Sequence, residues 1–259
     1  MGPAWSDGPV RGVYRTRDGG ESWERVLFVN ARTGAADLVM DPENPNKLFA
    51  ALWEFRRWPW SFESGGEGSG LFVTYDAGDT WRKAAPEDGF PSGELGRIGV
   101  AVAPTNPEVV YALVEAERNA LLRSSDGGRS WAVVNDTRDV NPRPFYYADI
   151  RVDPLNENRI YRLASSIDMS EDGGKSFNSV VSSAIIHGDV HELWIHPHDS
   201  RFMIMGNDGG IGITYNRGAS WRFVENLPLG QFYHINVDME VPYNVYGGLQ
   251  DNGSWFGPS

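Results

Sequence analysis

The segment Thr16-Arg17-Asp18-Gly19-Gly20-Glu21-Ser22-Trp23 decides the fold, because its pattern recurs four more times in the 259-residue chain. The copies occupy residues 74–81, 124–131, 170–177 and 214–221, and their central Asp or Asn positions are 44 to 58 residues apart. In each copy the acidic or amide side chain can accept backbone N–H bonds of a tight turn, and glycine permits a positive φ. The hydroxyl adds a local bond and the aromatic ring is expected to pack beneath the turn. This repetition indicates a repeat architecture.

A second pattern lies between the copies. An apolar run ends in Asp-Pro or a related pair at residues 41–42, 103–104, 153–154 and 196–197. Each unit therefore reads as four short strands in about 40–50 residues, with no helical periodicity, which is the signature of a propeller blade. We predict an all-β fold, a β-propeller of four-stranded antiparallel blades.

The repeated units predict a single propeller domain, residues 1–259. A half blade at 10–29 is followed by full blades at 34–86, 96–135, 145–181 and 190–225, and by a second half blade at 232–256. The half blades are complementary, so they either close a five-bladed ring or leave an open partial propeller. Open blade edges would permit self-association.

Composition excludes several classes of protein. The chain has no Cys, which excludes disulfides and thiolate metal sites, and a net charge of −12, which argues against nucleic acid as a partner. No apolar run reaches the roughly 20 residues of a membrane span. No signal peptide is visible in this chain.

The chain resembles a known family. Its eight-residue pattern resembles the Asp-box turn (BNR repeat) of sialidases, sortilin-type receptors and xyloglucanases. Residues 11–20, 33–42, 50–57, 96–100, 143–147, 187–191 and 247–253 resemble bacterial sortilin-type propellers that are often labelled glycosyl-hydrolase-like. Members are usually longer, so the resemblance implies an internal fragment of a protein exported to the periplasm or beyond. It implies ligand or peptide binding, and the hydrolase label does not by itself establish activity.

Alignment of the strands on the Asp-Pro turn places ionisable residues at one register position. Five residues before the proline position lie Asp37, Gly99, Asp149, Glu192 and His234; eleven residues after it lie Trp53, Glu115, Ser165, Asp208 and Gln250, with Glu54 and Asp251 adjacent. These residues should share the face opposite the aspartate turns. They could form a polar-ligand or cation site, or hydrogen-bonded channel lining. If the chain hydrolyses glycosides with a carboxylate pair, the candidates are Asp37, Asp149, Glu192, Asp208 and Asp251.

A histidine cluster is a candidate metal site. His187, Asp189 and His191 alternate onto one side of an extended segment, and His234 could approach from the next blade. Imidazole and carboxylate groups together can bind a divalent cation, which is the one possible cofactor. The alternative is a set of ordinary hydrogen bonds.

Aromatic residues are candidates for ligand contact. Trp58, Trp60 and Phe62 lie in a segment with five aromatics in ten residues, and Tyr146, Tyr147 and Tyr233 could line the same opening. With Gln250 and Asn252 they could hold a sugar or a partner peptide. The alternative is that they cover the core of their own blade.

Three functions remain open from the sequence. The first is a binding module for a carbohydrate or a peptide or protein ligand. The second is a glycoside hydrolase that uses a carboxylate pair on the same face. The third is a structural or assembly propeller without a small-molecule ligand.

Overall fold

The computed structural model describes residues 1–181, 187–224, 226–227 and 229–259. Its regular structure is almost entirely antiparallel β-strand. The opening hairpin is β1 (Val13–Arg15) with β2 (Glu24–Leu27), and the terminal sheet is β20 (Phe232–Val237), β21 (Asn244–Leu249) and β22 (Ser254–Pro258). The single short helix among the described residues is the 3-10 turn Pro86–Asp88. The predicted all-β fold of antiparallel four-stranded units is confirmed.

Four larger sheets lie between these ends, each with its strands paired in chain order. Sheet 1 consists of β3 (Thr33–Met40), β4 (Leu48–Trp58), β6 (Gly70–Thr74) and β7 (Arg82–Lys83), with β5 (Ser61–Ser64) paired to the end of β4. Sheet 2 consists of β8 (Ile98–Val102), β9 (Val110–Val114), β10 (Ala120–Ser124) and β11 (Ala132–Asn135). Sheet 3 consists of β12 (Asp149–Asp153), β13 (Asn156–Leu163), β14 (Ile167–Ser170) and β15 (Asn178–Ser179). Sheet 4 consists of β16 (Val190–Ile195), β17 (Met203–Asn207), β18 (Gly210–Thr214) and β19 (Arg222–Phe223).

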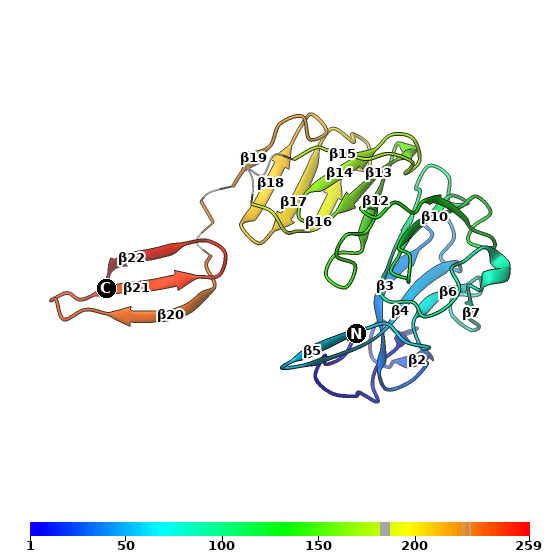
Figure 1. The fold of residues 1–259 in the computed structure, drawn as a ribbon, viewed down its shortest axis with the longest axis horizontal. Coiled ribbons are helices and arrows are strands. Elements are labelled where there is room, and N and C mark those ends of the chain that lie inside the picture. The colour runs from blue at the N-terminus through cyan, green and yellow to red at the C-terminus, as the bar shows by residue number, and fades with distance from the viewer. Residues whose placement is uncertain (182–186, 225, 228) are drawn as a thin grey trace.

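The hydrophobic core is divided into clusters, one between each pair of neighbouring sheets. Phe49 of β4 and Val110 of β9 are buried together between sheets 1 and 2, and Tyr111 and Ile150 lie between sheets 2 and 3. Tyr161 and Met203 lie between sheets 3 and 4. The first strands of successive sheets are neighbours, so the sheets follow one another around an arc (Figure 1). This packing of blade against blade is that of a propeller.

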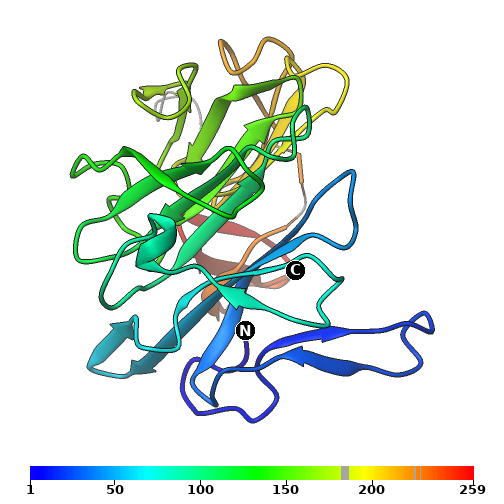
Figure 2. The same ribbon diagram turned by 90° about the vertical axis from the view of Figure 1, so that its right-hand side faces the viewer.

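Four of the five aspartate turns form the same hydrogen-bond pattern, and the fifth, which has Asn216, reverses one bond. In the third copy the Ser124 hydroxyl donates to Asp126 Oδ1 at 2.7 Å, and the Ser130 backbone N–H and hydroxyl donate to the same carboxylate at 2.9 and 2.6 Å. In the last copy Asn216 Oδ1 accepts the Ser220 N–H at 2.9 Å, and its Nδ2 donates to the Ser220 hydroxyl oxygen at 2.8 Å. Each aspartate turn fixes one end of the two strands that it connects. The aspartate turns do not cover the opposite side of the propeller. Figure 2 shows the β1–β2 turn and the β3–β4 connection on one side, and the β4–β5 hairpin on the other.

The two ends of the chain differ from the prediction. The last unit has three strands instead of two, because Asp251-Asn252-Gly253 turns the chain back into β22. Among the described residues, the opening hairpin and the terminal sheet do not pair with each other and belong to separate sheets. The terminal sheet stands apart from sheet 4 in Figure 1. Of the two arrangements expected from the sequence, this structure has the open one.

The aromatic residue of each aspartate turn is expected from the sequence to be buried, but its burial differs between the copies. Trp131 is buried against the core between sheets 1 and 2, whereas Trp23 is 61% exposed. Each later turn aromatic packs on the preceding sheet, and the opening hairpin has no preceding sheet in this chain. None of the described helical segments is long and apolar enough to cross a membrane.

Candidate functional site

Three of the carboxylates predicted at one register position contact the first strand of a neighbouring sheet. Asp37 Oδ2 accepts the backbone N–H of Val100 in β8 at 3.0 Å. Arg97, just before β8, lies 3.2 Å from Asp149 Oδ2 of β12, and Arg151 of β12 lies 2.6 Å from Glu192 Oε1 of β16. These contacts run around the arc from sheet 1 to sheet 4. They therefore join adjacent sheets, and the channel lining stays a prediction of the sequence.

Gly99 occupies the one register position without an ionisable side chain. A Cβ atom added to it would lie 1.6 Å from the carbonyl oxygen of Ala148 in the neighbouring sheet. The close approach of the two backbones therefore requires glycine there.

Asp37 has an unusual environment for a carboxyl group. Burial raises its pKa above the ordinary value, while the Val100 N–H and the positive charge of Arg151 oppose the shift and the negative charge of Asp149 adds to it. The strand bulges between Ala35 and Asp37, which turns the Asp37 side chain relative to a regular strand. A half-buried carboxyl whose pKa is raised, with another carboxylate nearby, is an arrangement that suits a general acid.

Aromatic rings form a continuous row over the same face. We call Phe55, Trp53, Phe62, Phe145, Tyr146, Tyr147 and His191 the aromatic row. Trp53 stacks on Phe55 with centroids 4.5 Å apart, and Phe62 lies 5.9 Å from Trp53 and 5.5 Å from Phe145. The row continues from Phe145 to Tyr146 at 6.4 Å, and from Tyr146 to His191 at 6.2 Å. It crosses from the β4–β5 hairpin of sheet 1 to β16 of sheet 4.

The row has a buried layer and an exposed layer. Trp53, Phe55 and Tyr147 are buried, while Phe145 and Tyr146 are exposed. Polar contacts hold the buried layer: Trp53 Nε1 donates to Ser64 Oγ at 3.0 Å. The exposed rings are therefore presented to solvent on a fixed base, which suits stacking against a ligand.

Arg97 joins the aromatic row to the carboxylates. Its guanidinium lies 5.8 Å from the Trp53 ring centre, donates to the Tyr146 carbonyl oxygen at 2.8 Å and pairs with Asp149. Glu115 Oε2 accepts the Arg97 backbone N–H at 2.7 Å and the Ser64 hydroxyl at 2.6 Å. One network therefore positions the row and the charged residues together.

The predicted metal ligands do not assemble in this structure. The Tyr147 hydroxyl donates to Asp189, His191 Nε2 lies 2.8 Å from Asp208 Oδ1, and His187 Nδ1 lies 3.1 Å from the Gly188 carbonyl oxygen. Within residues 1–181, 187–224, 226–227 and 229–259, no three His, Asp or Glu side chains are grouped so that they could hold a metal ion. The geometry thus corresponds to the alternative reading, a set of ordinary hydrogen bonds, and does not support a cation site.

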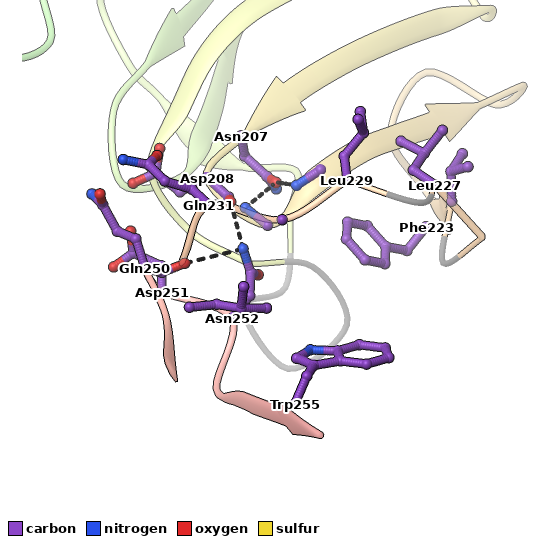
Figure 3. Close-up of a pocket in the computed structure, with 15 residues that line it drawn as sticks. Asn207, Asp208, Phe223, Leu227, Leu229, Gln231, Gln250, Asp251, Asn252 and Trp255 are labelled. Carbon is purple, nitrogen blue, oxygen red and sulfur yellow. Dashed lines mark hydrogen bonds between the residues drawn. The ribbon is translucent and has the colours of Figure 1, made fainter. Parts of the chain in front are cut away.

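Four other predicted residues gather in a pocket of about 800 Å³ between sheet 4 and the terminal sheet (Figure 3). They are Asp208, Gln250, Asp251 and Asn252. Asn252 Nδ2 donates to the Asp208 carbonyl oxygen at 3.1 Å, so this contact joins the terminal sheet to sheet 4. The apolar part of the lining consists of Phe223, Leu227, Leu229, Leu249 and Trp255.

The remaining predicted aromatics lie elsewhere. Trp58 and Trp60 are at the tip of the β4–β5 hairpin, where Trp60 is 81% exposed. Tyr233 and His234 lie on β20, whose residues are all exposed. Of the predicted set Trp58, Trp60 and Phe62, only Phe62 therefore lies in the aromatic row.

Sequence reasoning missed Trp255 and the role of Arg97. The Asn252-Gly253 pair followed by apolar residues is a hairpin signal that could have identified β22 and Trp255. The position of Arg97 depends on contacts between two sheets, for which the sequence carries no local signal.

Comparisons with known proteins agree with the fold and find similarity in sequence to xyloglucanases. No protein-family model matches the chain. It is 30% identical over 198 residues to a probable oligoxyloglucan-reducing end-specific xyloglucanase of Neosartorya fischeri, covering 70% of this chain and 23% of that protein. It is 24% identical over 250 residues to the oligoxyloglucan-reducing end-specific xyloglucanase of Emericella nidulans, covering 93% and 28%. The chain thus spans about a quarter of the length of these curated relatives.

Solved structures support the fold alone. An ancestral GH74 enzyme superposes with a TM-score of 0.52 at 17% identity, covering 86% of this chain and 31% of that chain. YCF48 from Cyanidioschyzon merolae superposes with a TM-score of 0.50 at 15% identity, covering 88% and 68%. The chain therefore has a β-propeller fold and is similar in sequence to xyloglucanases.

Proposed function

We propose that this chain is part of a propeller that binds a xyloglucan-type polysaccharide along the aromatic row and hydrolyses its glycosidic bonds. The observation that carries the proposal is the position of Arg97, which contacts Trp53 and Tyr146 of the row and the carboxylate of Asp149. A polysaccharide that stacks on the row would pass over the carboxylates. The similarity to xyloglucanases supports this substrate class.

Asp37 is the proposed general acid. Its half-buried carboxyl would donate a proton to the glycosidic oxygen as the bond between that oxygen and the anomeric carbon breaks. A water molecule would add to the anomeric carbon and give its proton to a carboxylate base, for which Asp149 and Glu192 are the candidates. Each of these is paired with an arginine, Asp149 with Arg97 and Glu192 with Arg151, which would orient it.

The test is the release of reducing ends from xyloglucan by the wild-type chain and by Asp37→Asn. Asparagine can still accept the Val100 N–H through its oxygen but cannot donate the proton. We expect release to fall by roughly 100-fold or more, the usual contribution of a general acid. Glu43→Gln, an exposed substitution in the β3–β4 turn, is the matched control and should leave release unchanged. Equal release by wild type and Asp37→Asn, or none by wild type, would contradict the hydrolytic proposal.

A second candidate is binding without cleavage, to a carbohydrate or a peptide. The observation that favours it is that Asp37, Asp149 and Glu192 all form contacts between neighbouring sheets, so a structural role already accounts for these carboxylates without catalysis. Retention of xyloglucan with no reducing ends released would favour this candidate.

The wider assignments made from the sequence are also proposals. They are kinship to sortilin-type propellers with Asp-box repeats, export of the parent protein, the division into half and full blades, and self-association through blade edges. The exposed strands of the terminal sheet are compatible with the last of these.

A further inference from the structure

The pocket between sheet 4 and the terminal sheet has the mixed lining of a ligand site. Leu229, Leu249 and Trp255 supply apolar surface, and Gln231, Gln250 and Asp251 supply polar groups (Figure 3). Its volume of about 800 Å³ lies in the range of small-molecule sites. A pocket of this size could take more than one sugar ring.

Its polar side chains are available to a ligand. Among the described residues, no hydrogen bond engages the side chain of Gln231, Gln250 or Asp251, whereas Asn207 Oδ1 accepts the N–H groups of Gly209 and Gly210 at 3.0 and 2.8 Å. An amide can donate and accept, and a carboxylate can accept. This set matches the hydroxyl groups of a neutral sugar, each of which both donates and accepts.

Trp255 supplies the flat surface that a sugar ring needs. Trp255 is 66% exposed and lies on β22, which directly follows the turn that carries Gln250 and Asp251. The C–H face of a pyranose packs against the electron-rich face of an indole, while the ring hydroxyls point to the polar groups around it.

The pocket begins where the aromatic row ends. His191, the last ring of the row, lies 2.8 Å from the Asp208 carboxylate, and the Asp208 carbonyl oxygen accepts the Asn252 side chain of the pocket at 3.1 Å. Asp208 therefore borders both sites. A polymer lying on the row would extend toward Trp255.

We infer that this pocket binds a further segment of the polysaccharide held by the aromatic row, so that one ligand chain extends from Phe62 to Trp255. The inference rests on the proposed function for the identity of the ligand. It adds that the chain selects long ligands over short ones, because only a long ligand reaches both sites.

The experiment measures equilibrium binding of xyloglucan oligosaccharides of one and of three repeat units. We expect the longer ligand to bind at least tenfold tighter. Trp255→Ala should lower the affinity for the longer oligosaccharide roughly three- to tenfold, the effect of one aromatic contact, and so remove most of its advantage. The affinity for the short oligosaccharide should be unaffected. Phe256→Ala, the adjacent exposed aromatic that does not line this pocket, is the matched control.

Gln231→Ala keeps the inference testable if Trp255→Ala disturbs the terminal sheet, because the Gln231 side chain is exposed. Gln231→Ala should lower the affinity for the longer oligosaccharide a few fold and leave the affinity for the shorter one unchanged. Equal affinity for both lengths, or no effect of either substitution on the longer ligand, would overturn the inference while leaving the proposed function intact. No binding of either oligosaccharide would overturn both.

Discussion

The carboxylate of Asp37 accepts the backbone N–H of Val100 at 3.0 Å, and this bond joins the first strands of sheets 1 and 2. The same side chain is the half-buried carboxyl that we propose as the general acid. One residue would thus serve both the contact between sheets and the reaction, and the two roles can be separated by substitutions that keep the bond.

Asp37→Asn is expected to stabilise the fold at neutral pH. Burial raises the pKa of Asp37 above 3.8. A carboxyl group whose pKa is raised by folding contributes stability that is fully present below the unfolded value and is lost as pH rises through the folded value. Asparagine avoids that loss, so the unfolding temperature at pH 7 should be higher for Asp37→Asn than for the wild-type chain. The difference should disappear near pH 3; a lower Tm for Asp37→Asn at pH 7 would contradict this reasoning.

The aspartate turns are expected to make stability fall in acid. Hydrogen bonds from the hydroxyl and N–H of Ser176, against some burial, lower the pKa of Asp172 to about 2, and those from Thr80 do the same for Asp76. A depressed pKa contributes stability that is present above the unfolded value of 3.8 and is lost as pH falls toward 2. Denaturant unfolding measured from pH 5 to pH 2 should show this decline. A flat profile would mean that the turns contribute little.

Asp172→Ala tests one turn directly. It removes the acceptor of the Ser170 and Ser176 hydroxyls, at 2.7 and 2.6 Å, and should lower the free energy of unfolding by about 1–2 kcal/mol. Asp172→Asn is the matched control, because Asn216 forms the equivalent turn in the last copy. If Asp172→Ala and Asp172→Asn unfold alike, the carboxylate bonds are not what holds the turn.

Gly99→Ala is expected to destabilise the contact between sheets 2 and 3. The new methyl group would meet the Ala148 carbonyl oxygen at 1.6 Å, which requires a backbone shift that costs about 1–3 kcal/mol. Gly206→Ala has no atom within 4 Å of the added group and should be close to neutral. Denaturant unfolding of both variants checks the prediction, and equal midpoints would show that the sheets separate easily.

Tyr146→Ala is expected to weaken binding of xyloglucan oligosaccharides three- to tenfold, the effect of one aromatic contact. Trp60→Ala, at the exposed hairpin tip outside the aromatic row, should leave the affinity unchanged. Affinity electrophoresis in xyloglucan gels compares the two variants. Loss of binding in Trp60→Ala with retention in Tyr146→Ala would place the ligand on the hairpin instead of the row.

The repeat made the fold predictable, because the aspartate turns and Asp-Pro pairs mark both ends of each strand pair. The register of Asp37, Asp149 and Glu192 also followed from these marks, since residues at equal distances from a turn lie at equal heights in neighbouring sheets. The residues that these carboxylates contact could not be predicted from the sequence. The position of Arg97 depends on how sheet 2 packs on sheet 3, and the pocket around Trp255 depends on where the terminal sheet lies. Such contacts join segments far apart in the chain and leave no local pattern.

The most direct test of the central claim is hydrogen–deuterium exchange of the chain with and without xyloglucan. If the polysaccharide lies along the aromatic row, residues 143–147 and the strand Ser61–Ser64 should exchange more slowly in its presence, and the aspartate turn at 124–131 should be unaffected. Slower exchange confined to the aspartate turns, or no change at 143–147 under saturating polysaccharide, would contradict it.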